Sequence, residues 1–303
     1  MIDPQLLKTN IEAIEENIRK RDLDIDLDKL KLLDESRRTL KFESEKLRAE
    51  QKILGKEIAS ASEKEKAILL EKAEKISNKV KSLSEETQQK DEEFFDAWIK
   101  IPNIVSSSSP VGKTDEDNKE IKKVGEPKNI KNPMTHLEIG ENLGLIDVER
   151  ASKISGSRFS YLFGDLVKIQ FNLVSYTLNK LSEKGFNPTI PPVLVRENAL
   201  FGTGFFPDDS DQVYEVQNDD LFLVGTSEVS LAALHTDEII DIEKLPLRYA
   251  GYSTCFRREA GTYGKDTSGI FRVHQFDKVE MFSFCDPETV SYTHLRAHET
   301  VMN

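Results

Sequence analysis

Two aromatic-rich runs in the 303-residue chain carry charged side chains at positions where a plain β-strand would carry apolar ones. The stretch reads CFRREAGTYGKDTSGIFRVHQFDKVEMF over residues 255–282, and a polar segment rich in Gly and Thr separates the two runs. This pattern predicts a β-hairpin. Because side chains alternate between the faces of a strand, Arg257 and Glu259 are expected to share a face of the first strand, and Phe276 and Glu280 a face of the second.

The residues on this face are of the types that hold a nucleotide and an amine. The guanidinium of Arg257 suits phosphate oxygens in two-point geometry and stays charged at any working pH. The ring of Phe276 offers a stacking surface for a base. Glu280, which is expected about 13 Å from Phe276 at about 3.3 Å per strand residue, suits an ammonium group. A solvent-facing strand with alternating charges is the simpler interpretation of any one residue, but it explains the whole ordered set less well.

Glycine-rich phosphate-binding motifs are absent from the sequence. No G-x-x-x-x-G-K-[ST] occurs, and no G-x-G-x-x-G follows a predicted strand. Phosphate binding would therefore fall to arginine side chains on a sheet.

The composition is that of a globular protein with a large charged surface. Hydrophobic residues make up 38% of the chain, charged residues make up 32%, and the net charge is −12. This acidic balance argues against nucleic-acid or membrane binding through total charge, but it permits a local surface that binds RNA.

The two cysteines, Cys255 and Cys285, form no CxxC pair. With no signal peptide and no long apolar run, the expected location is the cytoplasm.

A hairpin of two long helices is expected over residues of about 28–100. Leucines recur every seven residues, and a second apolar ladder follows with the alternating four and three spacing of a coiled-coil seam. Ser62 and Glu65 have capping-box spacing and predict where the second helix begins. The first ladder is Leu33, Leu40, Leu47 and Leu54, and the second is Leu69, Ala73, Ile76, Val80, Leu83 and Thr87. Polar seam positions, which predict a marginal coiled coil, are Arg37, Ser44 and Gln51.

The rest of the chain predicts an α+β fold. A polar connector follows the arm, and FGDLVKIQFNLVSYTLNKLSEKG predicts an amphipathic helix that ends at Gly185. The segments PTIPPVLV and LFLVGTSE predict strands before the hairpin. Helices and strands that do not alternate as βαβ units predict an antiparallel sheet flanked by helices.

The hairpin sequence closely resembles motif 2 of the class II aminoacyl-tRNA synthetases, in the form found in the bacterial-type seryl-tRNA synthetases. NPTIPPVLV followed by GTGFFP resembles motif 1 and its continuation, and LVGTSEVSL resembles the serine-binding TSE segment. The helical hairpin, followed by IPN and VGKTDEDN, stands where the family has its tRNA-binding coiled coil. The resemblance covers residues 1–289.

The resemblance implies roles for individual residues. Arg257 is implied to be the catalytic residue that contacts the α-phosphate of ATP, with Glu259 helping to hold the nucleotide. Arg258 belongs to the same ATP-binding motif, although strand alternation points its side chain the other way. Glu280 is implied to bind the ammonium group of serine. The implied adenine site is Val273, His274, Gln275 and Phe276, and the implied serine pocket is Thr226, Ser227 and Glu228. A helix N-cap is the alternative role of Thr226 and Ser227, and the two roles are compatible.

The implied reaction is ATP-dependent activation of serine to seryl-adenylate, followed by transfer to tRNA(Ser) and, by the same resemblance, tRNA(Sec). ATP and Mg²⁺ are the implied cofactors. A homodimer is expected, in which the arm of one subunit reaches the tRNA, and no membrane or DNA partner is expected. The alternative is a noncatalytic synthetase-like coiled-coil module that binds RNA or protein. The presence of Arg257, Glu259, Phe276 and Glu280 favours the enzyme.

The resemblance also implies segments that this sequence does not contain. In the family these segments carry motif 3, the main protein ligand of Mg²⁺ and the contact to the serine hydroxyl, so a C-terminally truncated chain with little adenylation activity is expected. His294 and His298 are spaced i, i+4, but no third ligand accompanies them, so no metal site is predicted. The expected organisation is a tRNA-binding domain (1–103), a linker (104–133), a partial class II catalytic domain (134–289) and a non-native tail (290–303).

Overall fold

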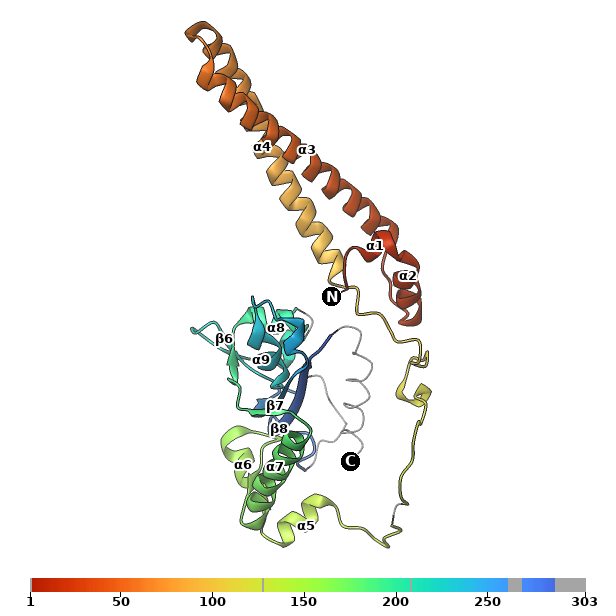
Figure 1. Ribbon diagram of the computed structural model, residues 1–303. Coiled ribbons are helices and arrows are strands. Elements are labelled where there is room, and N and C mark those ends of the chain that lie inside the picture. Colours follow the sequence, from red (N-terminus) through yellow and green to blue (C-terminus); the bar gives the residue numbers. More distant parts are fainter. Residues whose placement is uncertain (1, 127, 208, 261–268, 287–303) are drawn as a thin grey trace. The chain divides into compact units, whose positions relative to one another are not determined.

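The computed structural model describes residues 2–126, 128–207, 209–260 and 269–286 (Figure 1). The chain divides into two compact units, Met1–Pro127 and Lys128–Asn303, called unit 1 and unit 2 below. Long helices in one unit and small sheets with helices in the other confirm the predicted α+β class. None of the described helices is long and apolar enough to cross a membrane. The predicted tail, 290–303, lies outside the described residues.

Unit 1 is dominated by the predicted helical hairpin (Figure 1). The short helices α1 (Leu6–Thr9) and α2 (Ile11–Lys20) precede the long helices α3 (Leu27–Ser60) and α4 (Glu63–Trp98). The backbone N–H and the hydroxyl of Ser62 both donate to the Glu65 carboxylate, at 3.2 and 2.5 Å. The second long helix therefore begins at the capping box that the sequence predicts.

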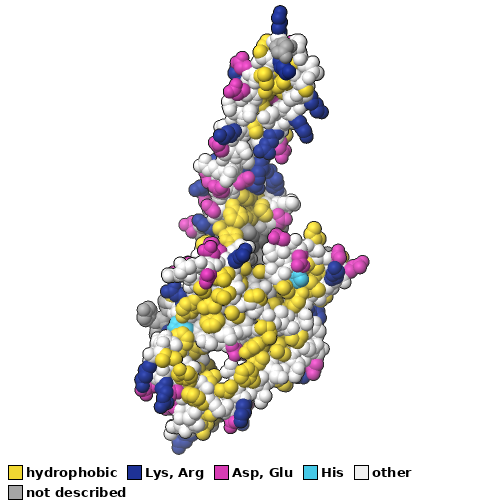
Figure 2. Space-filling view, turned by 90° about the vertical axis from the view of Figure 1, so that its left-hand side faces the viewer, with side chains coloured by type: hydrophobic (Ala, Val, Ile, Leu, Met, Phe, Trp, Pro, Cys, Tyr) yellow, Lys and Arg dark blue, Asp and Glu magenta, His cyan; other side chains and the backbone are white. Residues whose placement is uncertain are grey.

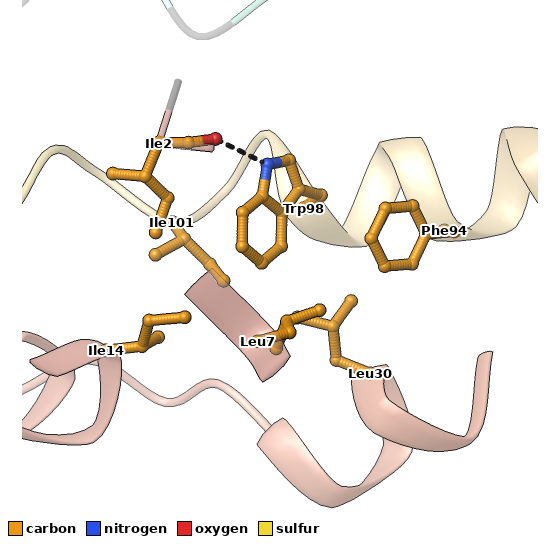
Figure 3. Close-up of a cluster of buried hydrophobic side chains, with 7 residues drawn as sticks. All are labelled: Ile2, Leu7, Ile14, Leu30, Phe94, Trp98 and Ile101. Atoms are coloured by element: carbon orange, nitrogen blue, oxygen red, sulfur yellow. Dashed lines mark hydrogen bonds between the residues drawn. The ribbon is translucent and has the colours of Figure 1, made fainter. Parts of the chain in front are cut away.

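The seam of the hairpin follows the predicted ladders. Leu30 and Leu54 of α3 and Leu83 of α4 are buried, and the other ladder positions are half-buried. Ser44 is buried at its polar seam position. At the base of the arm a hydrophobic cluster joins α1, α2, α3 and α4 (Figure 3). Within it the indole Nε1 of Trp98 donates to the carbonyl of Ile2 (3.0 Å), which fixes the N-terminal segment to the end of α4.

Unit 2 contains two three-stranded sheets, a two-stranded ribbon and five α-helices among its described residues. The first sheet is ordered β3 (Asn187–Thr189), β7 (Leu247–Phe256) and β8 (Gln275–Phe284). The second is ordered β4 (Leu194–Val195), β6 (Leu221–Leu223) and β5 (Tyr214–Val216). The ribbon pairs β1 (Ile146–Asp147) with β2 (Tyr161–Leu162). The helices are α5 (His136–Asn142), α6 (Val148–Ser155), α7 (Asp165–Glu183), α8 (Glu197–Gly202) and α9 (Glu228–Ala232).

One strand pair departs from the predicted antiparallel sheet. β3 pairs with β7 in parallel, whereas the other described pairs are antiparallel. The proline-rich segment also splits between two sheets, because β3 and β4 belong to different ones.

The long hairpin β7–β8 is covered on both faces. On one face Leu181 of α7 and the following Phe186 pack in a buried cluster with Ala250, Val279 and Met281. On the other face Leu231 of α9 packs over Gly251, where an added Cβ would lie 2.7 Å from Leu231 Cδ1. The glycine therefore allows α9, and the segment before it, to approach the strands closely. Side chains of β8 at even-numbered positions point to this α9 face.

Candidate functional site

The register of β7 and β8 places three site-face residues in a row. Phe276 lies opposite Cys255, Lys278 opposite Ser253, and Glu280 opposite Gly251. The predicted common face of Phe276 and Glu280 is therefore confirmed, because both lie within one regular strand.

The strands are shorter than the sequence pattern predicts. β7 ends at Phe256 and β8 begins at Gln275, so Arg257, Glu259 and His274 lie just beyond the strand ends. The prediction that Arg257 and Glu259 share a strand face was wrong, because Glu259 has a φ of 51° and the chain turns there. The polar segment between the strands includes residues 261–268, which lie outside the described residues.

Arg257 joins the end of the hairpin to the segment before α9. Its backbone N–H donates to the carbonyl of His274 (2.9 Å), and its Nε donates to the carbonyl of Gly225 (3.1 Å). The guanidinium carbon lies 5.2 Å from the centre of the Phe276 ring, which is a cation–π distance. The structure thus brings the cation and the aromatic ring together at the exposed end of the site.

Glu280 forms the other end of the site with Thr226 and Lys278. The hydroxyl of Thr226 donates to Oε2 of Glu280 (2.9 Å), and Lys278 Nζ lies 2.6 Å from the same oxygen. Lys278 Nζ also donates to Oγ1 of Thr226 (2.5 Å). Thr226 and Glu280 are 54 positions apart in the sequence, so folding joins the TSE segment to the hairpin.

Glu228 lies beside this cluster and adds a second carboxylate. Partial burial and, after it, the negative charge of Glu280 raise the pKa of Glu228 above its ordinary value, while the charge of Lys278 acts in the opposite direction. With all three groups charged, two carboxylates and one ammonium give this end of the site a net charge of about −1, by simple addition. That balance suits one further ammonium group.

Ser227 is placed differently from its neighbours in the TSE segment. Its side chain is fully buried, and the hydroxyl lies 3.4 Å from the carbonyl of Gly251, so it contributes to the packing under α9. Ser227 occupies the N-cap position of α9 without a side-chain capping bond. Instead, the Oγ1 of Thr226 accepts the backbone N–H of Glu228 (3.2 Å), so Thr226 combines a turn-stabilising bond with its bond to Glu280.

The residues expected at the adenine end do not all lie on the same face of β8. Phe276 is on the α9 face, whereas Gln275 is exposed and begins β8 on the α7 face. Nδ1 of His274 lies 2.8 Å from the carbonyl of Arg257, and its ring packs 5.1 Å from that of Phe159. Val273 is half-buried just before the strand.

Two charged residues nearby make contacts that the sequence pattern did not identify. Glu259 forms an ion pair with Arg272 and is largely buried. Arg258 is exposed, and its backbone N–H donates to the carbonyl of Gln212 (3.0 Å). The sequence pattern also did not identify Lys278 as the partner of Glu280 and Thr226. Its position two residues from Phe276 and Glu280 on one strand is the signal that indicates its face.

Comparison with known proteins identifies both parts of the chain. Residues 1–105 match the seryl-tRNA synthetase N-terminal domain, and residues 212–302 match the tRNA synthetase class II core domain (G, H, P, S and T). A serine–tRNA ligase of Streptomyces avermitilis is 48% identical over 99% of this chain and 71% of its own length. A serine–tRNA ligase of Mycobacterium marinum is 45% identical over 98% of this chain and 71% of its own length.

Solved structures agree with the sequence comparison. The seryl-tRNA synthetase of Pyrococcus horikoshii complexed with ATP superimposes with a TM-score of 0.89 at 36% identity, covering 99% of this chain and 73% of that one. The cytoplasmic serine–tRNA ligase of Naegleria fowleri in complex with AMP gives a TM-score of 0.84 at 31% identity, covering 98% of this chain and 70% of that one. The chain therefore belongs to the seryl-tRNA synthetase family, whose members are ligases.

Proposed function

We propose that this chain binds ATP and serine on the α9 face of β7–β8, as the site of seryl-tRNA synthesis. The observation that supports this most directly is the joining of two half-sites on one strand. Arg257 and Phe276 meet at one end, at 5.2 Å, and Thr226 meets Glu280 at the other, at 2.9 Å. One half suits a nucleotide and the other suits an ammonium group, which are the two ends of an aminoacyl-adenylate.

In the proposed reaction a carboxylate oxygen of serine attacks the α-phosphorus of ATP. A new P–O bond forms, the bond to the bridging oxygen breaks, and pyrophosphate leaves with the electron pair of that bond. The attacking carboxylate is already ionised, so no general base is needed. A ribose hydroxyl at the end of tRNA then takes the seryl group and AMP leaves. Positioning of the two substrates and charge stabilisation by Arg257 would supply the rate enhancement.

Each proposed role follows from a contact. Arg257 is held through its Nε by the Gly225 carbonyl, so its remaining N–H groups can face the α-phosphate. Phe276 would stack on the adenine, and Glu280 would take the ammonium of serine. We propose that Ser227 acts by packing beneath the pocket, since its hydroxyl faces the Gly251 carbonyl.

The remaining proposed site residues support the nucleotide and the pocket. Glu259 would act together with its ion-pair partner Arg272, and Arg258 would contribute charge at the exposed end. Glu228 would border the serine. Contacts to the adenine would come from Val273 and His274, and from the backbone of Gln275, whose side chain lies on the α7 face.

Mg²⁺ is proposed to enter with the ATP phosphates. The described residues contain no group of three or more His, Cys, Asp or Glu side chains that could hold a metal ion. Mg²⁺ is commonly bound through one or two carboxylates together with substrate phosphates, so an all-protein cage is not required.

The arm is proposed to bind tRNA(Ser) and, in organisms that use it, tRNA(Sec). Unit 1 matches the N-terminal domain of the family over residues 1–105, and α3 and α4, of 34 and 36 residues, make a hairpin long enough to span about 50 Å. Recognition of RNA by such an arm would follow the shape and backbone of the RNA more than its sequence.

We propose that the chain forms a homodimer through the exposed side of α7. Ile169, Leu173 and Tyr176 recur at helical spacing and are 58–62% exposed. They lie on the side of α7 away from Gln170, whose side chain donates to Asp277 on β8 (2.6 Å). Hydrophobic side chains also cover much of the unit 2 surface that Figure 2 shows. An exposed apolar stripe of this kind is typical of a protein–protein interface.

A noncatalytic synthetase-like module was the alternative function. It is not favoured, because the relatives that align with nearly the whole chain are serine–tRNA ligases.

Calorimetric titration with seryl sulfamoyl adenosine, a stable analogue of seryl-adenylate, tests the proposed site. The wild-type chain should bind it, and Glu280→Gln should weaken binding about tenfold or more, since a charge-assisted hydrogen bond contributes about 1.5–3 kcal/mol. The matched control is Glu183→Gln, because Glu183 is exposed and pairs with Lys180 on α7. Equal binding by wild type and Glu280→Gln would contradict the assignment.

A further inference from the structure

Lys278 holds the ammonium end of the site together but has no role in the reaction proposed above. Its Nζ lies 2.6 Å from Oε2 of Glu280 and 2.5 Å from Oγ1 of Thr226. The Lys278 and Glu280 side chains are only 29% and 25% exposed. Since partial burial strengthens ion pairs relative to fully exposed ones, this contact is expected to be persistent.

The contacts to Glu280 all end on one of its two carboxylate oxygens. Thr226 and Lys278 both bond Oε2, and within the described residues no hydrogen bond ends on Oε1. Because the carboxylate is planar, fixing Oε2 from two sides also fixes the direction of Oε1. Oε1 is then the acceptor that an incoming ammonium can use.

The charge of Lys278 also matters for the neighbouring carboxylates. Glu228 and Glu280 repel each other, and Lys278 offsets that repulsion. Without the lysine, two carboxylates would share the pocket without a cation, and such a pair tends to take up a proton. Lys278 therefore allows the two carboxylates to lie close together in one pocket.

We infer that Lys278 is a positioning residue for serine: it anchors Oε2 of Glu280 and directs Oε1 toward the substrate ammonium. This inference rests on the proposed function, because it assumes that Glu280 binds the ammonium. Lys278 positions Glu280 both directly and through Thr226, so its effect should be limited to ligands that carry an amino group.

The experiment measures how strongly binding depends on the amino group. The full chain is titrated with seryl sulfamoyl adenosine and with the same analogue in which hydrogen replaces the amino group. The quantity recorded is the Kd of the analogue without the amino group divided by the Kd of the analogue that has it. Lys278→Met should lower this ratio about tenfold while leaving the affinity for ATP unchanged. Lys278→Arg, which keeps the positive charge, should retain most of the wild-type ratio. Lys168→Met is the matched control, because Lys168 pairs with Asp165 in an exposed position on α7 (2.9 Å).

The outcomes separate this inference from the proposed function. A wild-type ratio near one would mean that Glu280 does not read the ammonium, which overturns the proposed pocket. A normal wild-type ratio that Lys278→Met leaves unchanged would overturn the inference alone, as would an equal loss of affinity for both analogues. If Lys278→Met does not fold, as judged by circular dichroism, Thr226→Val replaces it. That variant removes the other anchor of Oε2, and it should lower the ratio in the same way; an unchanged ratio again overturns the inference.

Discussion

At the scale of single residues, the site consists of Phe276 and Glu280 on one face of β8, each paired with a residue from outside that strand, Arg257 and Thr226 respectively. The common face of Phe276 and Glu280 could be predicted from the sequence, because side chains alternate between the two faces of a regular strand. The positions where the strands end could not be predicted. The chain turns at Glu259, which has a positive φ that a non-glycine residue seldom adopts. The bond between Lys278 and Thr226 depends on tertiary packing, and strand periodicity contains no information about it.

The proton on Glu228 should make the stability of unit 2 depend on pH. Because its pKa is raised in the folded protein, the folded state binds this proton more tightly than the unfolded chain does. Ionisation of Glu228 therefore lowers the free energy of unfolding as the pH rises from the ordinary pKa of 4.5 through the raised value. Glu228→Gln removes this effect, so the variant should gain stability relative to wild type across that window.

Tyrosine absorbance during urea unfolding measures this difference, because all seven tyrosines lie in unit 2. The midpoint of Glu228→Gln minus that of wild type should rise with pH above 4.5 and then level off. Glu149→Gln is a control of opposite sign, since a hydrogen bond from Lys153 and its charge lower the pKa of Glu149. Parallel curves for wild type and Glu228→Gln would show that Glu228 titrates alike in the folded and unfolded protein.

At the scale of elements, the arm was the most predictable part of the chain. Its heptad ladders and capping box specify two helices, a turn and an apolar seam within the sequence itself. The buried Asp34 was not predicted, because its partners become visible only in the folded hairpin. Arg37 and Arg38 lie 2.6 and 2.9 Å from it, and Arg37 also reaches Asp91 of α4 at 3.4 Å. This ion-pair network occupies a place where the heptad would accept an apolar residue.

Shortening the arm should separate RNA binding from adenylate binding. Deletion of 46–59 from α3 and 67–80 from α4 removes two heptads from each helix and keeps the capped turn. The arm then loses about 21 Å, at about 1.5 Å per residue, without a change of seam register. Filter binding at fixed salt should show at least a tenfold loss of tRNA(Ser) affinity, while the affinity for seryl sulfamoyl adenosine stays the same. Unchanged tRNA binding would mean that the outer arm does not contact the RNA.

At the scale of the whole molecule, the α+β class could be predicted, but the sheet arrangement could not. The parallel pairing of β3 with β7 joins segments about 60 positions apart, and alternation within each strand does not choose their direction. Likewise, the amphipathic pattern predicts α7 and its sheet-facing side, whereas only the structure shows that Ile169, Leu173 and Tyr176 remain exposed.

The exposed stripe on α7 predicts the assembly state. The chain of 34.5 kDa should sediment as a species of twice that mass, and Leu173→Glu should shift it toward the monomer, because a carboxylate in an apolar interface is costly to desolvate. Lys180→Glu changes a charge on the same helix at an exposed ion pair and serves as the control. A wild-type chain that sediments as a monomer at micromolar concentration would contradict the proposed dimer.

The central proposal is that one face of β8 holds an aminoacyl-adenylate from end to end. A crystal structure of the chain with seryl sulfamoyl adenosine tests it directly. The adenine should stack on Phe276, the sulfamoyl group should meet Arg257, and the amino group should lie on Oε1 of Glu280 with Lys278 still bonded to Oε2. A ligand bound elsewhere, or bound here with its amino group away from Glu280, would contradict the account.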